Sequence, residues 1–123
     1  DGVDGESVDF WRTALTQQDA VVRVVGPRLG TVATIAGEGL AVDGTAETMP
    51  SVLFDAVVIP GGEDAAAAMA AMGQLREFIR DQYRHAKPML AAGAGAAVLV
   101  AAGIPATLPD GEPDPGLIVV GDR

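Results

Sequence analysis

The sequence contains no cysteine and only one histidine, His85. The absence of cysteine excludes disulfide bonds, thiolate nucleophiles and zinc–thiolate sites, and a single histidine leaves little for binding a transition metal. Aromatic side chains are also scarce, with three Phe, one Tyr and one Trp among 123 residues. The core must therefore be built mainly from aliphatic side chains, which is typical of buried strands covered by close-packed helices.

Basic residues are also few. The sequence has 8 Lys and Arg residues and 17 Asp and Glu residues, which give a net charge of −9. Nucleic-acid binding relies on basic surfaces, so we expect no nucleic-acid partner. The uncharged stretch 88–109 is interrupted by Gly93, Gly95, Gly103 and Pro105, so we expect no membrane helix. The N-terminal residues do not read as a signal peptide. Together with the lack of cysteine, these features lead us to expect a cytoplasmic location.

Short runs of small and β-branched residues predict buried strands of a parallel sheet. The runs cover residues 20–25, 56–59, 89–92 and 117–120. Between the first two, residues 31–35 and 40–42 flank Gly37 and Gly39 and predict a β-hairpin.

Helices are expected before and between these strands. Val8, Trp11 and Leu15 have the spacing of one helical face, and Asp4 or Ser7 can cap that helix. An Ala-rich helical segment follows the Gly-Gly turn at 61–62. Another short helix is predicted after the third strand, over residues 94–102, and a glycine can end it.

Residues 74–86 form the clearest amphipathic helix in the sequence. One face carries Leu75, Phe78, Ile79 and Tyr83, and another carries Arg76, Arg80 and Arg84. Glu77 can pair with Arg80 and Asp81 with Arg84, so the pattern favours a solvated, charged face. His85, near the helix end, is more easily explained as a favourable cation at a helix C-terminus than as a general base.

Strands that alternate with helices in repeated βα units indicate a doubly wound α/β fold with a mostly parallel sheet, in a single domain over residues 1–123. The chain opens in a turn that leads into a helix, where such a fold would place the end of its first strand. It also ends without the helix that would usually cover the last strand. We therefore expect the first strand and the final helix to be missing from this chain, so that the domain is incomplete at both ends.

Sites of open α/β sheets form at the carboxyl ends of the strands. The Gly61-Gly62 turn places backbone N–H groups near a helix N-terminus, where they can hold an anion or an oxyanion. Glu63 and Asp64 stand beside the turn and would repel a phosphate. A tight structural turn is therefore the simpler interpretation of these glycines.

The turn after the third strand, at residues 93–98, can be compared with two motifs. As a dinucleotide-binding fingerprint it is weak, because Val98 stands where the third Gly or Ala belongs. As a nucleophile elbow it has the right position between a strand and a helix. Gly93 occupies the apex, however, and its neighbours Ala92 and Ala94 offer no Ser, Cys or Thr side chain. We therefore do not expect the chain by itself to be an enzyme.

Several segments together resemble the C-terminal domain of large-subunit haem catalases. They are residues 1–5, 21–25, 27–30, 43–45, 49–55, 60–62, 83–88 and 102–106. The resemblance therefore extends across nearly the whole chain. The Pro-Gly-Gly sequence at 60–62 is shared more widely, across the PfpI-like, class I glutamine-amidotransferase-like superfamily.

The resemblance implies a flavodoxin-like, three-layer αβα domain with a β-hairpin excursion, attached to a catalase core that carries the haem. It implies no cofactor in this chain, and as partners the catalase core domain and the symmetry-related subunits of a tetramer. In active PfpI-like enzymes, an acid from the first βα turn contacts a Cys at the elbow, and the Gly-Gly turn supplies oxyanion donors. By motif, the acid falls on Glu6 and the Cys position falls on Gly93. The oxyanion turn falls on Gly61 and Gly62. The resemblance thus implies a vestigial pocket without its nucleophile.

The leading hypothesis is a non-catalytic accessory domain of a catalase that decomposes hydrogen peroxide to water and oxygen. The domain would stabilise the tetramer and shape access to the haem. One alternative is a stand-alone PfpI-like hydrolase or glyoxalase that uses Glu6 and a water molecule in place of Cys. Another is a holdase or binding module whose Ala- and Val-rich surface captures unfolding proteins.

Overall fold

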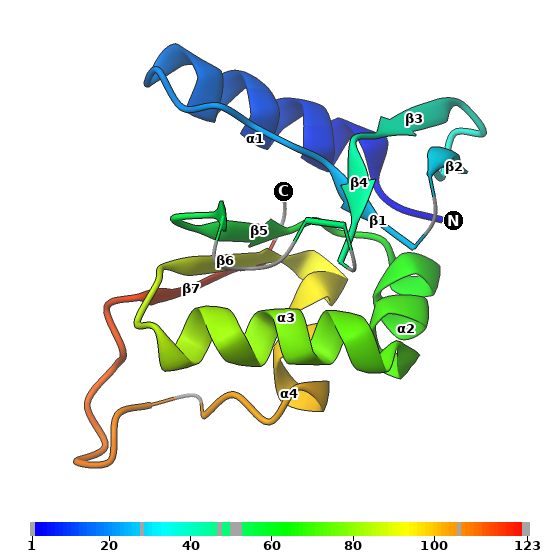
Figure 1. Cartoon of the computed structure of the whole chain (residues 1–123). Coiled ribbons are helices and arrows are strands. Elements are labelled where there is room, and N and C mark those ends of the chain that lie inside the picture. The colour runs from blue at the N-terminus through cyan, green and yellow to red at the C-terminus, as the bar shows by residue number, and fades with distance from the viewer. Residues whose placement is uncertain (1, 28, 47, 50–52, 106, 122–123) are drawn as a thin grey trace.

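The computed structural model describes residues 2–27, 29–46, 48–49, 53–105 and 107–121. In chain order, its elements are α1 (Gly5–Gln17), β1 (Val25–Gly26), β2 (Gly30–Ala33), β3 (Gly39–Val42), β4 (Gly44–Thr45), β5 (Val57–Ile59), α2 (Glu63–Ala71), α3 (Gly73–Arg84), β6 (Met89–Ala92), the 3₁₀ helix η2 (Gly93–Gly95), α4 (Ala96–Ala101) and β7 (Leu117–Val120). Figure 1 shows their arrangement.

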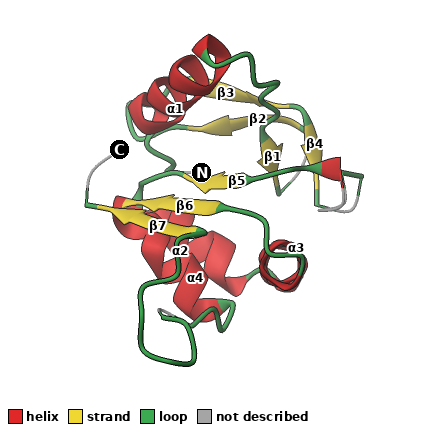
Figure 2. Cartoon of the chain, turned by 90° about the vertical axis from the view of Figure 1, so that its left-hand side faces the viewer, coloured by secondary structure: helices red, strands yellow, loops and turns green. Residues whose placement is uncertain are grey.

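Strands β5, β6 and β7 form a parallel sheet in that order, with Val57 opposite Met89 and Met89 opposite Leu117. Helices α2, α3 and α4 lie on one side of this sheet and α1 lies on the other (Figures 1 and 2). Strands β6 and β7 have the predicted bounds, and β5 is one residue shorter than predicted. The prediction of a layered α/β fold with a parallel sheet is confirmed.

Four further strands form two smaller sheets. Strands β2 and β3 make the predicted antiparallel hairpin, with Val32 opposite Leu40. Strand β1 pairs in parallel with β4, with Val25 opposite Gly44. In both views β1 and β4 lie beyond β5, on the side away from β6 and β7 (Figure 2). The described residues therefore form three separate sheets rather than one continuous sheet.

The prediction of a buried strand over residues 20–25 is wrong for most of this run. Only Val25 belongs to β1, and Val21 is 78% exposed. A strand rich in β-branched residues becomes buried when it has neighbours on both edges and layers on both faces. This segment pairs with β4 alone among the described strands, so Val21 is exposed and Val22, Val24 and Val25 are only half-buried.

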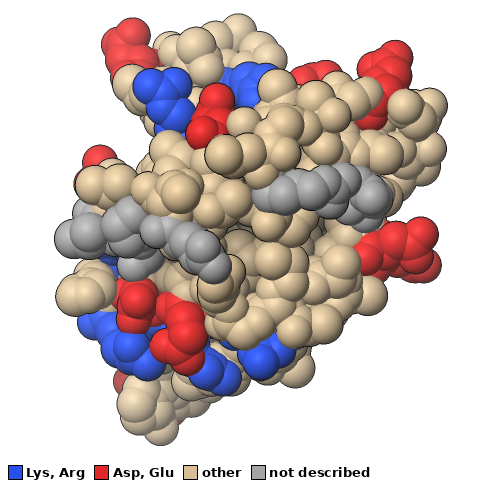
Figure 3. Space-filling model, turned by 45° about the vertical axis from the view of Figure 1, so that its right-hand side comes forward, with Lys and Arg blue, Asp and Glu red and all other residues tan. Residues whose placement is uncertain are grey.

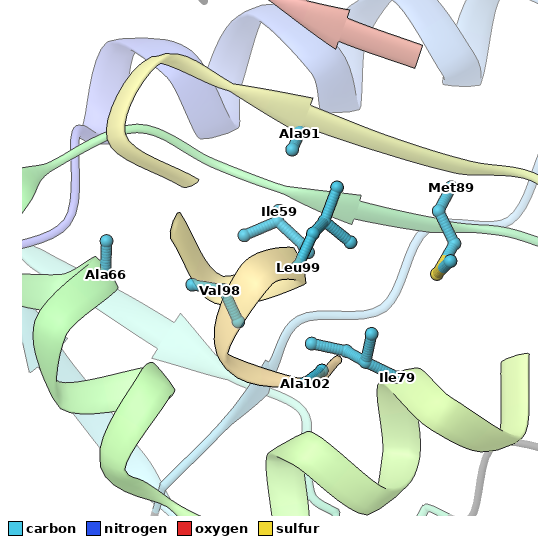
Figure 4. Packing of buried hydrophobic residues seen from close by; sticks show 8 residues of the cluster. All are labelled: Ile59, Ala66, Ile79, Met89, Ala91, Val98, Leu99 and Ala102. Atoms are coloured by element: carbon cyan, nitrogen blue, oxygen red, sulfur yellow. The ribbon is translucent and has the colours of Figure 1, made fainter. Parts of the chain in front are cut away.

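The main core lies between the β5–β6–β7 sheet and helices α2, α3 and α4. Its buried members are Ile59, Ala66, Ile79, Met89, Ala91, Val98, Leu99 and Ala102, and Figure 4 shows the strand side chains pointing toward the helices. Ala91 and Val98 are fully buried. Because an Ala side chain is small, α4 can pack close to the sheet. A smaller cluster of Val3, Val32 and Ala65 lies beneath the hairpin, and Met69 packs against both clusters.

Helix α3 confirms the predicted ion pairs and uses its arginines for more than a solvated face. Arg80 pairs with Glu77 at 2.7 Å, and Arg84 pairs with Asp81 at 2.6 Å. Acidic and basic side chains lie side by side in the lower part of Figure 3, where Figure 1 places α3. In addition, Arg80 Nε donates to the carbonyl oxygen of Ala102 at the end of α4, at 2.8 Å. Arg76 makes a similar 2.8 Å bond to a carbonyl in the last turn of α2.

Helix α1 has the predicted N-cap, because Asp4 Oδ1 accepts a hydrogen bond from the backbone N–H of Ser7 at 3.2 Å. Its predicted apolar face is only half-buried at Val8, Trp11 and Leu15, and Ser7 is the one buried residue of the helix. None of the helices that the structure describes has the length and hydrophobicity that a membrane crossing requires.

Candidate functional site

The carboxyl ends of β5, β6 and β7 meet at one edge of the sheet, and each strand is followed by glycine within two residues. A Cβ atom added to Gly93 would lie 3.9 Å from Gly61 Cα and 3.7 Å from the carbonyl oxygen of Gly121. The fold thus brings together two positions, Gly61 and Gly93, that are 32 residues apart by subtraction of their numbers. We call Gly61, Gly62, Gly93 and Gly121 the glycine cradle.

Gly93 has the backbone of a nucleophile elbow. It stands directly between β6 and η2, and its φ of 52° lies in the left-handed region. An added Cβ would meet no described atom closer than 3.7 Å, apart from its own chain neighbours. The elbow therefore has room for a side chain, and what it lacks is the nucleophile itself.

The Gly61-Gly62 turn is held in place by the residues that precede and begin α1. Gly61 accepts a hydrogen bond from the Asp4 N–H at 2.9 Å, and its own N–H donates to Ser7 Oγ at 3.4 Å. Gly62 has a φ of 112°, and an added Cβ would overlap the carbonyl oxygen of Gly2. Only glycine fits at position 62 without a shift of the backbone.

Ser7 and Asp4 are residues of this site that the sequence reasoning treated only as helix caps. Ser7 is 0% exposed, and its hydroxyl oxygen engages the Gly61 N–H, the group that the resemblance implies as an oxyanion donor. Asp4 Oδ2 would lie 3.7 Å from a Cβ on Gly61. In the sequence, a Ser or Asp before a helix indicates ordinary helix capping. No local signal therefore distinguishes the additional contact of these residues with Gly61.

Glu6, the acid selected by motif, is an exposed residue of the first turn of α1. It lines a shallow hollow along the outer side of that helix, together with Asp9, Phe10, Thr13, Ala14 and Gln17. The acid that lies against Gly61 is Asp4. The assignment of Glu6 to the vestigial pocket remains a prediction.

Chemically, the cradle presents backbone groups and few reactive side chains. His85 is exposed and forms the C-cap of α3, where its N–H donates to the Asp81 carbonyl at 3.1 Å. In the described part of the chain, no three His, Asp or Glu side chains are grouped so that they could hold a metal ion. The arrangement suits close backbone packing better than acid–base or nucleophilic chemistry.

Comparison of structures supports the same fold. The chain superposes on a two-domain protein from Anabaena variabilis with DJ-1/ThiJ/PfpI-like and ferritin-like domains, with a TM-score of 0.78 and 27% identity, covering 84% of this chain and 30% of that one. A DJ-1 superfamily protein from Salmonella typhimurium gives a TM-score of 0.78 at 22% identity, over 97% of this chain and 69% of that one. At that identity the likeness shows the fold alone.

Comparison of sequences identifies the family. Catalase HPII from Pseudomonas aeruginosa is 33% identical over 119 residues, which cover 97% of this chain and 16% of that protein. Catalase HPII from Mycobacterium avium is 39% identical over 105 residues, which cover 85% of this chain and 15% of that protein. The chain thus spans about a sixth of the length of these curated relatives. The family model of the C-terminal domain found in long catalases matches residues 4–117, and the chain belongs to that family.

Proposed function

We propose that the chain is a non-catalytic accessory domain of a large-subunit haem catalase. Its partners would be the catalase core and the symmetry-related subunits of a tetramer, and the parent would decompose hydrogen peroxide to water and oxygen. The observation that carries this proposal is the family match over residues 4–117, combined with an elbow that has Gly93 at its apex.

The site itself supports a non-catalytic role for this chain. A hydrolase-type mechanism needs a nucleophile at the elbow and a free donor for the oxyanion. Gly93 supplies no attacking atom, and the Gly61 N–H already donates to the buried Ser7 hydroxyl. A hydrolase reaction like that of active PfpI-like enzymes would therefore require both a new nucleophile at the elbow and the displacement of Ser7 from the Gly61 N–H.

We place the haem in the catalase core, and three side chains of this chain that could in principle bind its iron are poorly placed to do so. A haem iron is held by His, Cys, Met or Tyr in an apolar pocket. His85 is exposed, Tyr83 packs against the main core cluster, and Met89 is buried inside that cluster. None of these three side chains lines the hollow along α1.

Exposed apolar side chains offer surfaces for the rest of the proposed assembly. Ile118 and Val119 of β7 are 47% and 56% exposed, and Val100 of α4 is 77% exposed. Covering exposed apolar groups with a partner removes them from water, which stabilises the assembly. Packing of this kind would couple the stability of the domain to that of the tetramer.

The first test is the intact mass and the haem absorbance of the native protein that contains this sequence. We expect a polypeptide much larger than 12.5 kDa, with a Soret band that co-purifies with it. A lone, haem-free species near 12.5 kDa would contradict the proposal and leave a binding role as the main question.

A second measurement separates an accessory role from a catalytic one. Removing the domain from the parent should lower the melting temperature of the tetramer or change peroxide kinetics. Glu6→Gln in the intact parent is the matched control, and it should leave both quantities unchanged. A loss of peroxide turnover in Glu6→Gln with normal haem content would place catalysis in this domain and refute its accessory role.

A further inference from the structure

Methionine supplies all of the sulfur in this chain, because the sequence has four Met residues and no Cys. Met89 is 2% exposed and lies inside the main core, whereas Met49, Met69 and Met72 are half-buried. Peroxides convert an accessible thioether, which is apolar, into a polar sulfoxide. The three half-buried methionines are therefore the residues at which oxidation can begin, and the packing of each determines the consequence.

Met69 packs at the boundary between the two apolar clusters. Ala65 belongs to the smaller cluster, and its neighbour in sequence, Ala66, belongs to the main core. Met69 follows them by four and three residues, so it lies one turn further along the same side of α2. Of the side chains that the structure describes, Met69 alone packs against both clusters. Its side chain therefore joins the two.

The smaller cluster has few other buried groups to stabilise it. Its buried members among the described residues are Val3, Val32 and Ala65, which come from the segment before α1, from β2 and from α2. Three small side chains bury little apolar surface, so the half-buried contacts at the border of the cluster carry much of its stability. The unbranched, flexible side chain of Met is suited to filling such an irregular boundary.

Oxidation would place a polar group at this boundary. The sulfur lone pair attacks one oxygen of hydrogen peroxide, so that an S–O bond forms and the O–O bond breaks. The released hydroxide takes the proton of the transferred OH group, which leaves a sulfoxide and a water molecule; sulfur loses two electrons and the peroxide gains them. Burying the sulfoxide oxygen without a donor costs free energy, so it would turn toward water and withdraw the side chain from the clusters.

Met72 and Met49 are half-buried in different surroundings. Met72 lies where α2 ends and α3 begins, and it is not among the side chains that pack against either cluster in the described ranges. Met49 covers Gly44 of β4, where an added Cβ would overlap the Met49 sulfur. Oxidation of these two residues would therefore leave the contact between the clusters in place.

We propose that Met69 is a modification site for hydrogen peroxide, and that its oxidation to methionine sulfoxide uncouples the smaller cluster and the β2–β3 hairpin from the main core. The reaction needs only this chain and the peroxide, so the site does not depend on the proposed function. The proposed function adds the setting, because the substrate of a parent catalase would be the oxidant.

Two double variants of the 123-residue chain test the site. Met49→Leu with Met72→Leu keeps Met69, and Met49→Leu with Met69→Leu keeps Met72. Leu is close to Met in volume and has no sulfur to oxidise. Both proteins retain the buried Met89, so they differ only in which half-buried methionine is available. After treatment with hydrogen peroxide, the readouts are peptide mass spectrometry, the melting temperature and the methyl NMR spectrum.

In the protein that keeps Met69, we expect sulfoxide to form at Met69 about tenfold faster or more than at Met89, which must be exposed by opening of the core. The melting temperature should fall by about 5 °C or more. Methyl signals of both clusters should shift, and methionine sulfoxide reductase should reverse these changes. In the protein that keeps Met72, the same treatment should change the melting temperature by less than about 2 °C.

Oxidation of Met69 as slow as that of Met89 would overturn the site. Equal losses of melting temperature in the two variants, or methyl shifts confined to one cluster, would show that Met69 does not join the clusters. These outcomes do not change if the parent protein proves haem-free, so failure of the site and failure of the catalase assignment are distinguishable.

Partial oxidation of the unsubstituted chain gives the same answer if a variant does not fold. After brief heating, Met69 sulfoxide should be enriched in the precipitated fraction, because the chains that carry it are less stable. Met72 sulfoxide should be divided equally between the precipitated and the soluble fractions. Equal division of Met69 sulfoxide as well would overturn the proposal.

Discussion

Two glycines in the turn after β6 are required for opposite reasons. Gly93 has a left-handed backbone with open space around its Cα, whereas Gly95 has an ordinary helical φ of −57° with no space at all. A Cβ on Gly95 would lie 2.8 Å from the carbonyl oxygens of Ile59 and Pro60. Gly93 is needed because its backbone is left-handed, and Gly95 is needed because it allows α4 to approach β5 closely.

Gly93→Asn and Gly95→Ala should therefore differ strongly in stability. Asn tolerates the left-handed region, so we expect Gly93→Asn to cost less than about 1 kcal/mol. Gly95→Ala forces the backbone of residues 59–60 to move, and we expect a loss of about 2 kcal/mol or more. Urea unfolding of both variants measures the difference. Equal losses would show that the turn adapts and that close packing at Gly95 is unimportant.

At the scale of elements, α3 holds together the ends of its two neighbouring helices. Carbonyl groups in the last turn of a helix have no partner within the helix. Arg80 and Arg76 supply donors to such carbonyls on α4 and α2, respectively. The ion pairs of the same arginine row are solvent-exposed, so they contribute less than these partly buried bonds to backbone carbonyls.

We expect Arg80→Met to destabilise the protein by about 1–2 kcal/mol, because Met keeps the aliphatic stem but leaves the Ala102 carbonyl without its donor. Arg84→Met is the matched control, since Arg84 makes exposed ion pairs with Asp81 and Glu77, and it should cost less than about 0.5 kcal/mol. Thermal unfolding at low and high salt reports both effects. A large, salt-sensitive loss in Arg84→Met would show instead that the surface charges dominate.

At the scale of the whole molecule, repulsion between like charges opposes self-association through an apolar edge. The net charge of −9 keeps copies apart at neutral pH, and the sequence pI is about 4.3. Strand β7 has no charged residue and, among the described strands, pairs only with β6; its Ile118 and Val119 are exposed. An uncharged edge strand is a favourable place for contact between copies.

The isolated chain should therefore associate as the pH approaches about 4.3, and Val119→Lys should reduce that association. Ala67→Lys is the matched control, because it adds the same charge to an exposed position on α2. Light scattering during an acid titration follows the process. Equal protection by both variants would mean that net charge alone controls association and that the β7 edge has no special part.

The sequence predicts most elements of this fold because their signals are local. The apolar spacing of α3, the cap of α1, the hairpin glycines and the runs that became β6 and β7 each reflect interactions among nearby residues. The same applies to the elbow, where a glycine between a strand and a helix already indicates a missing nucleophile. The Ala-rich segment after the Gly-Gly turn forms α2, and the separate amphipathic segment forms α3.

Pairing between distant residues was decided only by the tertiary structure. Residues 20–25 have the composition of a buried strand, yet none of them is fully buried, because burial depends on a neighbour on each edge, which composition cannot encode. Ser7 reads as a cap, yet it meets Gly61 across 54 residues. By itself, the sequence determined the periodic elements, the fold class and the empty elbow. The tertiary structure decided which edges pair, which acid lies at the cradle and which arginines hold helix ends, because those outcomes depend on contacts between segments far apart in the chain.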